Sequence, residues 1–73
     1  MEKTQVKFSA AEEVKEFVRA AEKCDFDIDV IYNKIVVDAK SLLGVLTLAA
    51  YPVYVACHGT DAAFNSVCQK FAY

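Results

Sequence analysis

The chain has 73 residues, of which 56% are hydrophobic and 25% charged, and its net charge at neutral pH is −2. These values predict one small folded domain over residues 1–73 and exclude a disordered chain. The absence of a basic cluster argues against nucleic acid as a partner, and no apolar run approaches the ~20 residues of a membrane span. Because the first residues also lack the apolar core of a signal peptide, we expect a cytoplasmic protein.

The first elements in chain order are a strand and a helix. Residues 4–8 alternate apolar and polar side chains, which predicts a half-buried strand. Ser9 and Glu12 then match a capping box, with Ser9 as the N-cap and Glu12 reaching back to its amide. Behind it, apolar residues recur with helical spacing as far as Lys23, which predicts an amphipathic helix of about four turns. Its apolar stripe is expected to consist of Val14, Phe17, Val18 and Ala21.

The middle of the chain predicts a hairpin. Residues 26–32 alternate again, with apolar side chains facing inward and aspartates on the solvent side. Asn33 and Lys34 form a plausible tight turn into a third strand over residues 35–37. The solvent-facing aspartates are Asp25, Asp27 and Asp29.

The last third of the chain predicts a helix, a strand and a helix. A short helix begins at Ser41, and a fourth strand begins at Pro52, where a missing N–H is tolerated. Gly59 ends this strand, and Thr60 or Asp61 caps the final helix. The inner stripe of that helix is expected to be Ala63, Phe64, Val67, Cys68 and Phe71.

The resulting order, β-α-β-β-α-β-α, predicts an α+β open-faced sandwich with a four-stranded antiparallel sheet. Right-handed crossovers make the first two strands parallel and place the fourth strand between them. The first and last helices each have one apolar stripe, so both should cover the same face of the sheet. The expected core is Phe17, Ile28, Val30, Val53, Val55, Phe64, Val67 and Phe71.

The cysteines fit neither a disulfide framework nor a zinc site. Cys24, Cys57 and Cys68 are odd in number and widely spaced. We therefore expect small core residues in a reducing compartment, and we expect no metal and no cofactor.

A motif that could carry a chemical modification follows the third strand, where Lys40 and Ser41 precede Leu42-Leu43-Gly44. The Ser41 hydroxyl can cap the short helix, or it can carry a phosphoryl group. With the element order and the length, the run from Lys40 to Leu48 resembles HPr, the histidine phosphocarrier of the bacterial sugar phosphotransferase system. The resemblance extends over nearly the whole chain and implies the fold of that family.

The start of the first helix departs from this family. HPr proteins carry a Gly-(Ile/Leu)-His-Ala-Arg-Pro signature there, in which the histidine accepts the phosphoryl group. The resemblance puts Ala10 at the histidine position, Glu12 at the arginine and Glu13 at the proline, and only Ala11 is retained. Alanine has no nucleophilic nitrogen, and two glutamates occupy the field that would attract a phosphate. We therefore predict that this site carries no phosphoryl group.

The single histidine, His58, lies at the end of the fourth strand. That strand should run antiparallel to the first, which places His58 at the end of the sheet away from Ala10, with no arginine near it in sequence. A solvated histidine is the simpler interpretation. A divergent phosphotransferase component that uses His58 is the alternative function, and a structural domain that has lost phosphotransfer is a third.

The resemblance also implies a regulatory site at Ser41. This serine lies where Gram-positive HPr proteins, and a histidine-less paralogue involved in catabolite repression, are phosphorylated by a dedicated kinase. An unmodified N-cap explains the same residue, and the sequence leaves both open.

A partner-binding surface is expected beside Ser41. In the family, the leucines of this helix form an apolar docking patch, and one or more of them should be exposed next to the first helix. We therefore predict a non-enzymatic regulatory or interaction module whose partner is a protein, such as a kinase acting on Ser41 or a transcriptional regulator. The expected surface consists of Ala10, Ala11, Lys40, Leu42, Leu43 and Leu46.

Overall fold

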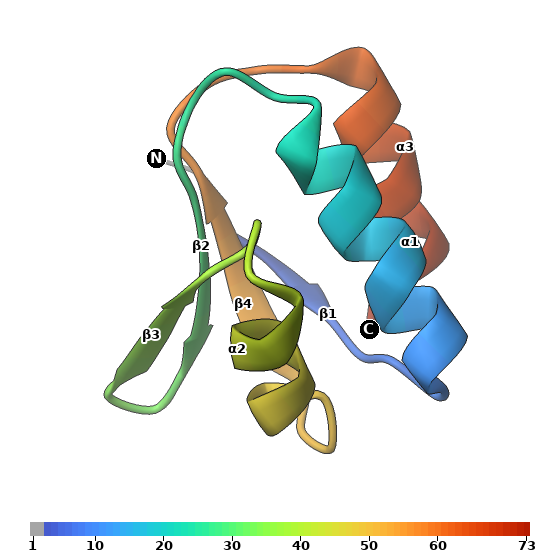
Figure 1. Ribbon diagram of the computed structural model, residues 1–73, viewed down its shortest axis with the longest axis vertical. Coiled ribbons are helices and arrows are strands. Elements are labelled where there is room, and N and C mark those ends of the chain that lie inside the picture. The colour runs from blue at the N-terminus through green and yellow to red at the C-terminus, as the bar shows by residue number, and fades with distance from the viewer. Residues whose placement is uncertain (1–2) are drawn as a thin grey trace.

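The computed structural model describes residues 3–73 and has the predicted order of elements (Figure 1). The short strands follow the alternating segments of the sequence, and the helices follow the segments with helical spacing. The elements are β1 (Lys3–Val6), α1 (Ala11–Glu22), β2 (Ile28–Tyr32), β3 (Ile35–Asp38), α2 (Leu42–Leu48), β4 (Val53–Cys57) and α3 (Ala62–Lys70).

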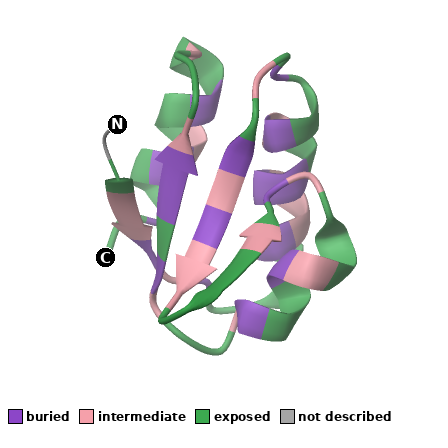
Figure 2. Cartoon of the chain, turned by 90° about the vertical axis from the view of Figure 1, so that its left-hand side faces the viewer, coloured by how far each residue is buried: buried purple, intermediate pink, exposed green. Residues whose placement is uncertain are grey.

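The sheet has the order β1-β4-β2-β3, and every neighbouring pair is antiparallel. As predicted, β4 lies between β1 and β2. The helices lie on one face of the sheet, and Figure 2 shows the molecule from the other face. Asn33 has a φ of 54°, a left-handed conformation that asparagine tolerates in the two-residue turn between β2 and β3. The predicted open-faced sandwich is confirmed.

The core lies between the sheet and helices α1 and α3. Phe17 is fully buried at its centre, with its ring centroid 5.2 Å from that of Phe8 and 5.4 Å from that of Phe64. Phe8 is buried although β1 ends at Val6, because the chain leaving the strand turns this ring under α1. All the expected core residues are buried except Val67, which is only partly buried.

Helix α3 begins as predicted but buries a narrower face than expected. Its N-cap is Asp61, whose Oδ1 accepts a hydrogen bond of 2.8 Å from the Phe64 N–H. Phe64 and Cys68 are buried as expected, but Ala63 is exposed. The apolar stripe of α3 is wider than the face that the sheet covers, so Ala63 and part of Val67 lie toward α1 instead.

The cysteines are all free thiols, with Cys24 and Cys68 buried and Cys57 half-buried. Burial raises the pKa of the Cys68 thiol to about 12, and the nearby Cys57 thiol adds to this shift. These thiols therefore remain protonated at neutral pH, as small core residues should.

Candidate partner-binding surface

The N-terminus of α1 has no side-chain cap. Its N-cap is Ala10, whose extended backbone has a φ of −152°, and both acidic residues of the first turn, Glu12 and Glu13, follow it. Glu12 lies 3.6 Å from the Lys15 ammonium. This end of α1 therefore holds two carboxylates, and Ala10, at the position of the family's histidine, has no nitrogen that could accept a phosphoryl group.

The predicted capping box of Ser9 and Glu12 is wrong. The chain enters α1 one residue later than expected, so the third helical residue is Glu13. Its Oε1 accepts a hydrogen bond of 2.6 Å from the Ser9 N–H. The reciprocal bond is missing because the Ser9 hydroxyl lies outside the cap position. The Glu13 carboxylate thus already accepts the hydrogen bond of the Ser9 N–H, the backbone donor next to Ala10.

The N-terminus of α2 is built differently. Ser41 is the N-cap, as predicted, and its Oγ accepts a hydrogen bond of 3.2 Å from the Gly44 N–H. The first turn of α2 contains no acidic residue. Ser41 is exposed, so its hydroxyl is accessible from solvent.

The three leucines of the expected surface are all exposed. Leu43 exposes 76% of its surface, and Leu42 and Leu46 expose 38% each. The buried face of this seven-residue helix consists of Val45 and Leu48, which leaves the leucines on the outer side. These three neighbouring leucines are therefore not part of the core. A cluster of exposed apolar side chains is typical of a docking surface.

A hollow of about 390 Å³ connects α2 to the start of α1. Leu46 lies on one side of it, and Ala10 and Ala11 lie on the other. Leu42 and Leu43 do not line this hollow, so they extend the apolar surface along α2. The residues that line it are Lys7, Phe8, Ser9, Ala10, Ala11, Val14, Leu46, Ala49 and Ala50.

Lys40 faces the other end of α1. Its Nζ donates a hydrogen bond of 2.9 Å to the Cys24 carbonyl, just beyond the C-cap Lys23. Lys40 also has its backbone N–H bonded to the Asp38 Oδ1 at 2.9 Å. The segment before α2 is therefore held in place, with Lys40 beside Ser41 but directed toward α1.

Comparison with known proteins identifies the family. The family model described as "PTS HPr component phosphorylation site" matches residues 9–71. The chain belongs to the HPr family. Proteins of this family are phosphocarriers that interact with other proteins of the phosphotransferase system. The comparison with curated proteins finds no match.

Among solved structures, HPr-C-His from Thermoanaerobacter tengcongensis is similar to this HPr-family chain. The two have a TM-score of 0.75 and 20% sequence identity, and the match covers 96% of this chain and 89% of that chain. This likeness shows a shared fold.

His58 lies at the far end of the sheet from the start of α1. In the β1–β4 pairing Lys3 lies opposite Ala56, so His58 lies beyond the first residue of β1, whereas Ala10 follows its last. Its Nε2 lies 3.1 Å from the Asp29 Oδ2, and both side chains are partly exposed. The separation expected from the sequence is confirmed, and the contact with Asp29 adds an anion beside the imidazole.

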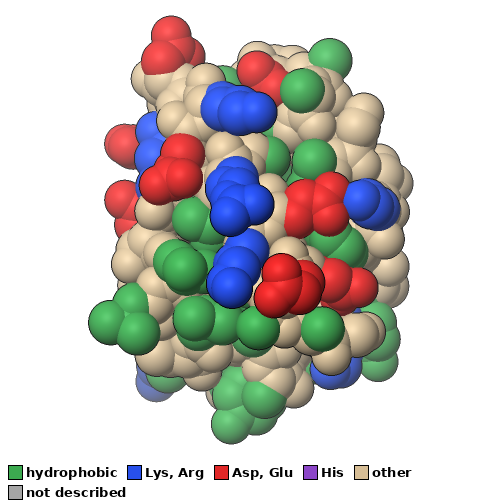
Figure 3. Space-filling view, turned by 45° about the vertical axis from the view of Figure 1, so that its right-hand side comes forward, with side chains coloured by type: hydrophobic (Ala, Val, Ile, Leu, Met, Phe, Trp, Pro, Cys, Tyr) green, Lys and Arg blue, Asp and Glu red, His purple; other side chains and the backbone are tan. Residues whose placement is uncertain are grey.

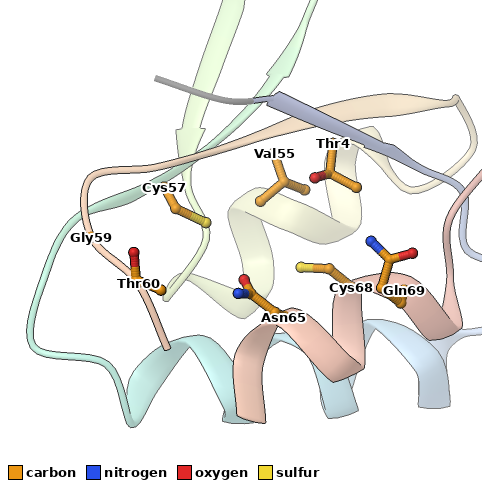
Figure 4. A pocket seen from close by; sticks show the side chains of 8 residues that line it. All are labelled: Thr4, Val55, Cys57, Gly59, Thr60, Asn65, Cys68 and Gln69. Atoms are coloured by element: carbon orange, nitrogen blue, oxygen red, sulfur yellow. The ribbon is translucent and has the colours of Figure 1, made fainter. Parts of the chain in front are cut away.

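Another hollow, of about 530 Å³, lies between α3 and the strands β1 and β4 (Figure 4). Cys57 and Cys68 point into it, together with neutral amides and hydroxyls. It contains no charged residue, and residues 3–73 bring together no group of three or more metal-ligating side chains. Within the same range, no helix is long and apolar enough to cross a membrane. The residues that line the hollow are Thr4, Val55, Cys57, Gly59, Thr60, Asn65, Cys68 and Gln69.

Proposed function

We propose that this HPr-family protein is a non-enzymatic cytoplasmic interaction module. It binds a protein partner through the surface formed by Ala10, Ala11, Leu42, Leu43 and Leu46, with Lys40 at the opposite border beside Ser41. It carries no phosphoryl group at the start of α1. The observation that carries this proposal is the pair of carboxylates at that helix start, where Ala10 supplies no nucleophile.

The electrostatics of the α1 N-terminus support the loss of phosphotransfer. A helix start binds a phosphate through unpaired N–H groups and its partial positive charge. Here Glu13 occupies the Ser9 N–H, and Glu12 adds a second negative charge in the first turn. A phosphoryl donor would therefore meet like charges and find no imidazole nitrogen at position 10.

The exposed leucines support a role in binding. The apolar hollow between Leu46 and Ala10 continues onto Leu42 and Leu43, so one partner can cover both helices. Covering apolar surface of this kind supplies the main driving force of most protein association. The chain thus keeps the surface through which the family docks while lacking the reactive centre beside it.

Ser41 is the candidate switch of this surface. A phosphoryl group on its exposed hydroxyl would place close to two negative charges beside Leu42 and Leu43. The first turn of α2 contains no acidic residue, and the nearest carboxylate in sequence is that of Asp38, which accepts the Lys40 N–H. We expect the fold to remain intact, because the N-terminal end of α2 and the adjacent Lys40 offset the added charge. We propose that the partner is a kinase acting on Ser41 or a transcriptional regulator that senses its phosphorylation.

The decisive experiment is phosphotransfer. The protein is incubated with phosphoenolpyruvate and Enzyme I, and acid-labile phosphate is measured by mass spectrometry of the intact chain. We expect no labelling under conditions that label an active HPr completely. Stoichiometric labelling of His58 would contradict the proposal and support a divergent phosphocarrier, an alternative favoured only by the contact between His58 and Asp29.

A second experiment tests the surface. Pull-downs from the source cell use the wild type, Leu43→Lys and Ser41→Asp, and captured proteins are identified by mass spectrometry. Val36→Lys is the matched control, because Val36 is exposed on β3 and its side chain points to the opposite face of the strand from Val37, which faces Gly44 of α2. A partner lost with Leu43→Lys and retained with Val36→Lys supports the proposal, and a set of captured proteins that none of the variants changes contradicts it.

A further inference from the structure

A second groove lies on the other side of α1, away from α2. Helices α1 and α3 run antiparallel to each other (Figure 1), and the groove between them has a volume of about 480 Å³. Its floor consists of the small apolar residues Ala20, Ala63 and Val67. Ala20 comes from α1, and Ala63 and Val67 are the residues by which the apolar stripe of α3 exceeds the core. Ala63 is exposed, and Ala20 and Val67 are only partly buried, so the groove exposes apolar surface that the fold itself does not fully bury.

One wall of this groove is basic. Lys15, Arg19 and Lys23 recur every four residues along α1, which places them in a row on one side of the helix. Figure 3 shows such a row of basic side chains on this side of the molecule. The row stands out because the chain as a whole has a net charge of −2.

Two of the three basic residues in this row form no ion pair within residues 3–73. Lys15 is paired with Glu12 at 3.6 Å, and Glu16, the other acid of the groove, is paired with Lys70 at 2.5 Å. Arg19 and Lys23 are exposed and form no ion pair within residues 3–73. The groove therefore presents a guanidinium and an ammonium, one helical turn apart, beside an apolar floor.

We infer that this groove docks an amphipathic helix of a protein partner, with acidic side chains along one border. Small residues on the floor let a third helix approach closely, and its apolar face would cover Ala20, Ala63 and Val67. Carboxylates spaced four residues apart on that helix match the spacing of Arg19 and Lys23, and Arg19 can bind one of them bidentately. This surface is separate from the α2 surface, so the protein can hold two partners at once.

The test uses a short synthetic amphipathic helix with an Ala/Leu face and glutamates every fourth residue along its border. A second peptide has lysines in place of those glutamates. Each is titrated into the ¹⁵N-labelled protein, and amide chemical shifts give both the affinity and the location. We expect the acidic peptide alone to bind, with shifts confined to α1 and α3, and we expect its affinity to fall as salt is added.

Matched variants locate the two kinds of contact. Arg19→Glu should weaken binding by about tenfold or more, which corresponds to about 1.4 kcal/mol, whereas Lys34→Glu makes the same charge change at the β2–β3 turn and should have no such effect. Ala63→Gln should obstruct the floor, and Ala62→Gln is its neighbouring control outside the groove. Well-dispersed amide spectra establish that each variant is folded.

Several outcomes would overturn the inference. These are equal binding of the acidic and basic peptides, shifts located at α2, an affinity that Arg19→Glu leaves unchanged, or no binding at millimolar peptide. Tighter binding of a single-stranded oligonucleotide than of the acidic peptide would also overturn it, since the row would then recognise phosphates. Concentration-dependent shifts of the groove amides without peptide would identify a second copy of the chain as the occupant.

Discussion

The two helix starts near the α2 surface have opposite chemistry. Helix α1 begins at an alanine without a side-chain cap and has two glutamates in its first turn, whereas α2 begins at a capping serine and has no acid in its first turn. Both belong to one HPr-family domain and both adjoin the same apolar surface. In our proposal, the chain keeps a docking surface at α2 while three side chains, Ala10, Glu12 and Glu13, reverse the electrostatics at the start of α1.

The largest effect we expect comes from restoring the first helix start. Ala10→His alone should give little acid-labile phosphate with Enzyme I, because Glu12 and Glu13 would still repel the phosphoryl donor. Adding Glu12→Arg and Glu13→Pro should raise the labelling rate by about 100-fold or more over the single variant, since donors and positive charge at the site then favour the transferring group. Full transfer by Ala10→His alone would show that the glutamates do not block the site.

A smaller effect is expected at the second helix start. Ser41→Ala removes the acceptor for the Gly44 N–H and should lower the free energy of unfolding by about 1 kcal/mol in urea titrations. Ser9→Ala is the control, because its hydroxyl forms no cap, and it should cost less than about 0.5 kcal/mol. Equal losses in the two variants would contradict the assigned caps.

The comparison also predicts a gain of stability. Ala10→Ser would supply α1 with the hydroxyl cap that it lacks and should raise the free energy of unfolding by about 0.5–1 kcal/mol. Hydrogen exchange of the first-turn amides of α1 should slow in the same variant. If the stability falls instead, then the Glu13–Ser9 bond already serves as the cap and a serine disturbs it.

The smallest effect is expected for Gly44→Ala. Alanine favours a helix interior by about 1 kcal/mol over glycine. However, its Cβ would lie only 3.2 Å from the Ser41 Oγ and 3.4 Å from the Val37 Cβ, which crowds the cap. We expect these effects to cancel to within about 0.5 kcal/mol of the wild-type free energy of unfolding, measured in urea. A full 1 kcal/mol gain would mean that the Ser41 cap is easily displaced.

The fold could be predicted because apolar residues recur with helical spacing in the helices and alternate with polar ones in the strands. The stripe through Val14 and Phe17, and the alternation of Ile28 with Val30, each allow only one buried face. The sequence places the start of α1 one residue too early, because Ser9-Glu12 and Ala10-Glu13 both fit the spacing of a helix entry. The structure decides between them, since Ala10 has the extended backbone of an N-cap.

The exposure of the α2 leucines could be predicted from the sequence, whereas the groove between α1 and α3 could not. The α2 leucines are adjacent in sequence, so the pattern of one short helix already shows that some must be exposed. The groove depends on how Ala20 packs near Ala63 and Val67, which are far away in the chain. Nothing in the α3 pattern alone distinguishes an apolar residue that faces the sheet from one that faces α1.

The hydrogen bond between the Lys40 ammonium and the Cys24 carbonyl joins the start of α2 to the end of α1. Phosphorylation of Ser41 would offer Lys40 a charged acceptor next to it, in competition with that carbonyl. Cys24 follows Lys23, which lines the groove between α1 and α3. If the bond exchanges in this way, the two surfaces are thermodynamically linked. A partner in the groove would then change the affinity at α2 by the same factor by which the α2 ligand changes the affinity of the groove.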